Sequence, residues 1–100
     1  MLKISVIDNP TRCLLVLEGK LIAPWAVELR TACEKVRTDL NGRELVIELR
    51  HVTAISHEGE TVVLELMNEG VRFLSRGVFS KHTLKELTRR ARGDLRELKR

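Results

Sequence analysis

The polar side chains best suited to chemistry gather in one short stretch, Ser56-His57-Glu58-Gly59-Glu60. An imidazole beside a carboxylate can be drawn as an acid-base pair, but adjacent residues need not face one another, and no third group or nucleophile completes the set. The same residues suit the start of a helix, where a serine caps backbone N–H groups and the helix dipole favours carboxylates. We therefore expect a binding corner here and not an enzyme active site.

The histidines and cysteines do not form a metal-binding pattern. His51, His57 and His82 lack the close spacing that zinc ligands show. Cys13 and Cys33 lie in apolar periodic segments, which predicts small core residues and not ligands or a disulfide. A glycine-rich phosphate loop is also missing from the sequence. We expect no metal and no cofactor.

The excess positive charge is concentrated near the C-terminal end. The net charge is +4, yet residues 1–80 carry 10 basic and 11 acidic side chains, whereas residues 81–100 carry 8 basic and 3 acidic ones. We interpret 81–100 as a basic helix or arm. Such a segment is either the solvated face of a terminal helix or a surface that contacts phosphate or an acidic partner. The contact residues would be Lys81, Lys85, Arg89, Arg90, Arg92 and Arg96.

Composition predicts one globular domain. The chain has 100 residues, of which 43% are hydrophobic, enough for a core of its own. None of its apolar runs approaches the roughly 20 residues that span a bilayer, and the first residues enter a strand-like alternation without the features of a signal peptide. We expect a cytoplasmic protein without membrane contact.

The first elements that must position the corner are a hairpin and a helix. Residues 3–8 alternate with period two, as an edge strand does, and 13–18 are apolar on both faces, which favours an interior strand that ends at Gly19. Pro24 suits a first helical position, and apolar residues then recur at helical spacing as far as Leu40, which predicts a helix of about 15 residues.

The corner lies between the next strand and helix. A strand over 45–55 leads into a helix from Ser56 to about Met67, and a short strand follows over 71–74. Ser80 is a candidate N-cap for a last helix, and Gly93 is a position where that helix could break. The order of elements predicts an α/β fold with a parallel sheet after the opening hairpin.

With this order, the chain resembles a STAS domain, the fold of bacterial anti-sigma-factor antagonists. The resemblance rests on the hairpin, on GKLIAPWAVEL at 19–29 and on LVIELRHVTAISHEG at 45–59, and it covers nearly the whole chain. It implies a single STAS-like domain over 1–100, with about four strands in a mostly parallel sheet, an opening antiparallel hairpin and three packed helices.

The sequence departs from the family at the corner. The family has an aspartate, two serines and a glycine there, which fall on Ser56, His57, Glu58 and Gly59. In the family the second serine accepts phosphate from a partner kinase that doubles as an anti-sigma factor, and phosphorylation switches binding off. Glu58 has no hydroxyl, and its single negative charge imitates only part of the roughly 1.5 to 2 charges of phosphoserine. We therefore expect no phosphorylation at this position.

The resemblance implies a non-enzymatic protein-interaction module that acts by partner switching in bacterial signalling or transcription regulation. Its partner would be a protein such as an anti-sigma factor or a kinase-type regulator. Two other hypotheses remain open at this point: a nucleic-acid-binding protein that uses the basic helix, and a STAS-like domain that handles a small ligand or lipid. The partner-binding residues would be Ser56, His57, Glu58, Gly59 and Glu60.

Overall fold

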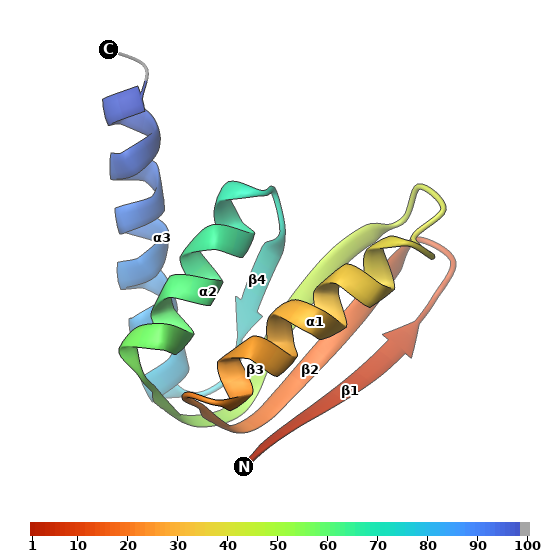
Figure 1. Ribbon diagram of the computed structural model, residues 1–100, viewed down its shortest axis with the longest axis horizontal. Coiled ribbons are helices and arrows are strands. Elements are labelled where there is room, and N and C mark those ends of the chain that lie inside the picture. Colours follow the sequence, from red (N-terminus) through yellow and green to blue (C-terminus); the bar gives the residue numbers. More distant parts are fainter. Residues whose placement is uncertain (99–100) are drawn as a thin grey trace.

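The computed structural model describes the backbone of residues 1–98 and the side chains of 1–77 and 81–91. Its four strands form one sheet in the order β1-β2-β3-β4, in which β1 runs antiparallel to β2 and the other neighbours are parallel. Figure 1 shows the sheet with its helices. The elements are β1 (Leu2–Asp8), β2 (Arg12–Leu21), α1 (Trp25–Arg37), β3 (Glu44–Ile55), α2 (His57–Asn68), β4 (Arg72–Ser75) and α3 (Val78–Leu98).

This arrangement is the α/β fold with an opening antiparallel hairpin that the sequence predicted. The alternating strand β1 lies at the edge of the sheet, and the two apolar strands β2 and β3 lie inside it. One boundary was wrong: β2 does not end at Gly19 but continues to Leu21. Gly19 has a φ of 110°, and the pairing with β3 shifts on either side of it, so the glycine is an irregularity within the strand and not its end.

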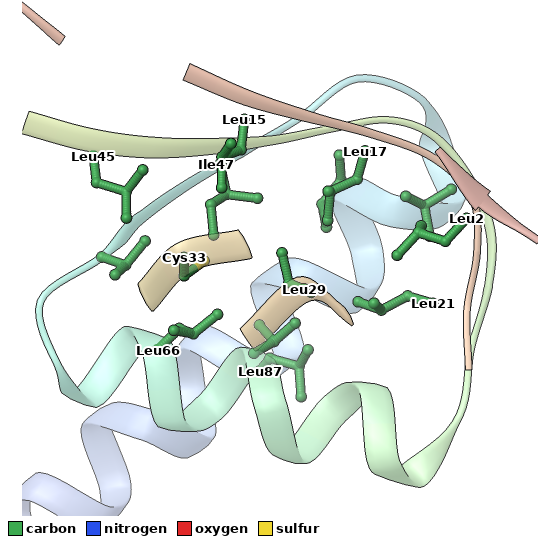
Figure 2. Packing of buried hydrophobic residues seen from close by; sticks show 14 residues of the cluster. Leu2, Leu15, Leu17, Leu21, Leu29, Cys33, Leu45, Ile47, Leu66 and Leu87 are labelled. Carbon is green, nitrogen blue, oxygen red and sulfur yellow. The ribbon is translucent and has the colours of Figure 1, made fainter. Parts of the chain in front are cut away.

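The main core lies between one face of the sheet and the helices. Figure 2 shows leucine side chains of β2 pointing from the strands toward α1 and α2, and Leu87 of α3 lies in the same cluster. Leu15, Leu17 and Ile47 are fully buried there. The opposite face of the sheet carries a smaller cluster, made of Leu14, Val16 and Val46 with Leu74 against them.

The first helix is shorter than predicted. It spans 13 residues, begins after Pro24 instead of at it, and ends at Arg37, before Leu40. The peptide bond between Ala23 and Pro24 is cis. Asn41 and Gly42 do take the predicted left-handed conformation, with φ of 51° and 84°, but they shape the loop into β3 and do not directly end the helix.

The start of the last helix was also predicted wrongly. It begins at Val78, so Ser80 lies within the helix and is not its N-cap. The helix continues past Gly93 to Leu98 without the break that the glycine suggested, since a single glycine lowers helix stability by only about 1 kcal/mol. In the described part of the chain, no helix is both long enough and apolar enough to cross a membrane.

Candidate functional site

The corner lies at the carboxyl ends of the two central strands. Leu21, the last residue of β2, pairs with Ile55, the last residue of β3, and α1 and α2 begin shortly after these positions. The backbone N–H of Ser56 donates a hydrogen bond of 3.1 Å to the carbonyl of Leu21. Parallel strands with short connections to helices commonly gather binding residues at this edge.

Ser56 is the N-cap of α2, as its position in the sequence predicted. Its backbone is extended, and its hydroxyl oxygen accepts a hydrogen bond of 3.2 Å from the N–H of Gly59. Its carbonyl accepts the first bond of the helix, 2.9 Å from the N–H of Glu60. The hydroxyl is therefore engaged with the backbone, and it fixes the direction in which the helix leaves the corner.

Gly59 is buried because the helix passes close to the end of β2. A Cβ atom at this position would lie 2.2 Å from the Leu21 carbonyl oxygen and 3.1 Å from Cγ2 of Ile55. No side chain fits between this helical turn and the backbone of β2. The residue allows this close approach by its small size, and its predicted contact with a partner stays a prediction.

His57 and Glu58 project from the first turn of α2 into solvent. The pKa of the Glu58 carboxyl is lowered from its ordinary value of 4.5, first by a hydrogen bond from its own backbone N–H and then by one from the Ser56 hydroxyl. Burial acts in the opposite direction, and the charge of His57 lowers the pKa by a smaller amount. Glu58 is thus a fixed negative charge at a helix N-terminus. This is the position that the family resemblance gave to the phosphate acceptor.

The other residues of the predicted site point elsewhere. Glu60 is half-buried, and its carboxylate accepts a hydrogen bond of 3.4 Å from Arg90 of α3. The structure therefore brings Ser56, His57 and Glu58 together at the surface of the corner, whereas Gly59 lies beneath it and Glu60 faces the last helix.

An ion-pair network that sequence reasoning missed joins α1 to the C-terminal half of α2, away from the corner. Arg30 donates to Glu65 at 2.8 Å and to Glu69 at 3.1 Å, and Arg37 also donates to Glu69. The pKa of the Glu69 carboxyl is lowered, first by Arg37 and then by Arg30, against a contribution from burial. The two arginines lie far from the two glutamates in the sequence, and only the packing of the two helices brings the opposite charges together.

An exposed apolar residue lies at the start of the neighbouring helix α1. Val27 lies in the first turn of α1 and is 67% exposed, whereas Ala26 and Leu29 of the same helix are buried. Ala23 and Pro24, at the entrance to the same helix, are also exposed. Val27 and Glu58 both lie in the first turns of helices that follow the carboxyl ends of the central strands.

The basic face of α3 is partly neutralised by ion pairs. Arg89 contacts Glu86 at 2.7 Å, and Arg90 contacts Glu60 at 3.4 Å and Glu86 at 4.0 Å. Lys81 and Lys85 are exposed. The remaining candidates for phosphate contact, the side chains of Arg92 and Arg96, lie outside the described residues.

A shallow hollow lies at the other end of α2, away from the corner. It has a volume of about 290 Å³ and lies between the end of α2, β4 and α3. Sequence reasoning named no pocket, because these residues come together only in the fold. Its lining residues are Met67, Asn68, Val71, Arg72, Phe73, Thr88 and Ala91.

The two cysteines are core residues, as predicted. Cys13 and Cys33 are free thiols that are 1% and 0% exposed. Burial raises the pKa of the Cys33 thiol to about 11, so the reactive thiolate form is strongly disfavoured. In residues 1–77 and 81–91, the side chains do not form a group of three or more histidines, cysteines or acids that could hold a metal ion.

Comparison with solved structures supports the fold. The chain is similar to an uncharacterized protein of the DUF3478 family with a SpoIIAA-like fold from Shewanella loihica PV-4, with a TM-score of 0.53 and 13% sequence identity over 82% of this chain and 73% of that one. No protein-family model and no curated protein sequence matches this chain. The SpoIIAA-like fold confirms the architecture that the resemblance to STAS domains implied, and at this identity the likeness shows the fold alone.

Proposed function

We propose that this protein is a non-enzymatic interaction module of the anti-sigma-factor antagonist type, which binds a protein partner through the corner at the start of α2. The observation that carries the proposal is the position of Glu58. It is an exposed carboxylate on a turn that Ser56 caps and that Gly59 locks against β2. Because the backbone of this turn is fixed, little backbone freedom is lost there when a partner binds.

The exposed groups at the starts of α1 and α2 suit a protein partner better than a small molecule. Val27 offers an exposed apolar contact on the neighbouring helix, and His57 can donate a hydrogen bond. A central apolar contact with polar groups around it is typical of protein interfaces. The partner would be an anti-sigma factor or a kinase-type regulator, and the module would act in bacterial signalling or transcription regulation.

The permanent charge of Glu58 has a consequence for regulation. A carboxylate at this helix N-terminus supplies part of the charge that a phosphoserine would supply, and it cannot be removed by a phosphatase. The module would therefore stay in one binding state, and partner switching by phosphorylation at this position would not occur.

The test compares three baits on beads in bacterial cell extract: the wild type, Glu58→Ser and Glu34→Ser. Glu34 is an exposed carboxylate near the C-terminal end of α1, so its loss controls for a change of net charge alone. We expect mass spectrometry to identify a signalling protein whose recovery changes at least fivefold with Glu58→Ser and stays unchanged with Glu34→Ser. Equal recovery of every protein by all three baits would contradict the proposal.

The same extract separates the proposal from nucleic-acid binding. Phosphate-driven attachment weakens steeply between about 50 and 200 mM salt, because counterions compete for the phosphates. RNA or DNA that dominates all three samples and is released in this range would assign function to α3 in place of the corner. Two of the arginines on α3 are already paired with glutamates, which does not favour this outcome.

A further inference from the structure

We propose that the free edge of β1 pairs with β1 of a second copy of this chain, so that the two sheets join into one. This surface is separate from the corner, and the inference does not rest on the proposed function. β1 is the terminal strand of the sheet, and Figure 1 shows it at the border, with α1 lying over β2 and β3 instead. An uninterrupted edge strand is a template for pairing with another strand.

The strand lacks the features that usually block such pairing. All seven of its residues pair with β2 in one register, without a bulge, and it contains no proline. Lys3 is its sole basic side chain. Val6 and Ile7 are 53% and 46% exposed, although they point to opposite faces of the sheet. Two adjacent β-branched residues in solvent are unusual on a protected edge, and pairing would cover both.

The hydrogen bonds to β2 show which groups of β1 point outward. The N–H of Lys20 donates to the carbonyl of Met1 at 3.1 Å, and the N–H of Asn9 donates to the carbonyl of Arg12 at 3.0 Å. Since antiparallel ladders alternate with a period of two, the odd-numbered residues of β1 direct their N–H and C=O groups toward β2. The even-numbered residues direct theirs outward, namely Leu2, Ile4, Val6 and Asp8.

These four residues determine the register with a second copy. A two-fold axis perpendicular to the sheet places like faces together, so an antiparallel partner strand must pair even residues with even ones. With the axis at Ser5, Ile4 lies opposite Val6 of the second copy and Leu2 lies opposite Asp8. Every outward group of the four residues then has a partner. If the pairing is shifted by two residues in either direction, the outward groups of Leu2 or of Asp8 have no partner in the second copy.

The side chains agree with this register. Ile4 and Val6 lie on the helix-covered face, beside Leu17 and Leu15 of β2, so pairing would extend the apolar core across the axis. On the other face Lys3 lies opposite Ile7, and the two Ser5 residues meet. Like charges never oppose each other, and such self-complementarity favours a second copy over an unrelated extended peptide.

The test measures mass in solution and then the register. Sedimentation equilibrium of the whole chain between about 10 μM and 1 mM should show the average mass rising from 11.4 kDa toward twice that value. Val6→Lys should shift the midpoint of this rise to at least tenfold higher concentration, while circular dichroism shows that the variant is folded. A monomer over the whole range, or a midpoint that Val6→Lys leaves unchanged, would overturn the proposal.

A cysteine at the axis tests the register itself. Ser5→Cys should form a disulfide between copies on mild oxidation, because directly opposite residues bring their Cβ atoms to about 4.5–5.5 Å. Lys3→Cys is the matched control: its counterpart in the second copy lies about 13 Å away along the strand, so little cross-linking is expected. The native cysteines do not interfere, since both are buried. Equal cross-linking of the two variants would overturn the proposed pairing.

Discussion

At the scale of single residues, Gly59 shows how a small side chain can decide the geometry of a site. Gly59→Ala would raise helix propensity, yet the added Cβ would lie 2.2 Å from the Leu21 carbonyl oxygen, and backbone cannot move aside as a flexible side chain can. We expect a loss of about 1–3 kcal/mol in the free energy of unfolding, measured by urea denaturation. Thr61→Ala, on the exposed side of the same helix, should change it by less than about 0.5 kcal/mol. A Gly59→Ala variant as stable as the wild type would mean that the close approach is not required.

Glu58 gives a prediction for pH. Its pKa is lowered in the folded state, so its ionised form stabilises the fold above the ordinary value of 4.5, and this contribution is lost as the pH falls through the lower, folded-state pKa. Glu58→Gln should therefore be less stable than the wild type at pH 7, and the difference should shrink below about pH 4.5. Urea midpoints from pH 7 to pH 3 measure it, with Glu34→Gln as the control that should follow the wild type throughout. A difference that grows toward acid pH would contradict the assignment.

These residues also show what the sequence could and could not predict about the site. The cap at Ser56 was predictable because all its partners lie within the next turn of the chain. The role of Gly59 was not, because the atom that excludes a side chain there belongs to Leu21, on a different strand. Local hydrogen bonding can be inferred from neighbours in sequence, whereas a close approach requires the fold.

At the scale of elements, ion pairs join α1 to the C-terminal half of α2. Arg30 contacts both Glu65 and Glu69, and these side chains are partly exposed, so their attraction is screened by solvent. We expect a double-mutant cycle of Arg30→Ala and Glu69→Ala to give a coupling of about 0.5–1 kcal/mol in urea denaturation, falling at 1 M salt.

The control for this cycle is a weaker pair elsewhere in the molecule. Arg72 and Glu44 lie 3.9 Å apart, on β4 and at the start of β3, and both are more exposed than Arg30. Their coupling should be near zero. If both cycles give the same value, the network does not contribute more than an ordinary surface pair.

The ends of helices and strands were predictable where the residue types in the sequence change sharply. They were not predictable where contacts with other elements set the end. The start of α2 follows from Ser56. The helix α3 begins at Val78, two residues before Ser80, so the capping preference of this serine did not locate the start of that helix. Likewise β2 continues through Gly19, since pairing with both neighbouring strands outweighs the weak strand preference of one glycine.

At the scale of the whole molecule, the two faces of the sheet differ in a way that the sequence conceals. The interior strand β2 is apolar on both faces, which in a parallel sheet usually indicates helices on both sides. Here the core cluster that includes side chains of all three helices lies on one face, while the apolar cluster on the opposite face is small, made of Leu14, Val16 and Val46 with Leu74 against them. The order of elements was predictable from periodicity, but the distribution of helices depends on how each connection crosses the sheet.

Two adjacent leucines of β2 allow a direct comparison of these faces. Leu15 is fully buried beneath the helices, and Leu14 is 9% exposed on the opposite face. Truncation of Leu15 leaves a closed cavity between sheet and helices, so Leu15→Ala should lower the free energy of unfolding by about 3–5 kcal/mol. Truncation of Leu14 removes apolar contact at a face that water or nearby long side chains can fill, and we expect a loss of about 1–2 kcal/mol. Both variants are measured by urea denaturation with the slope compared to the wild type. Equal losses would show that the second face is covered as tightly as the first, for example by another copy of the chain. If the Leu14→Ala loss then depended on protein concentration, the cover would be a second copy and not packing within one molecule.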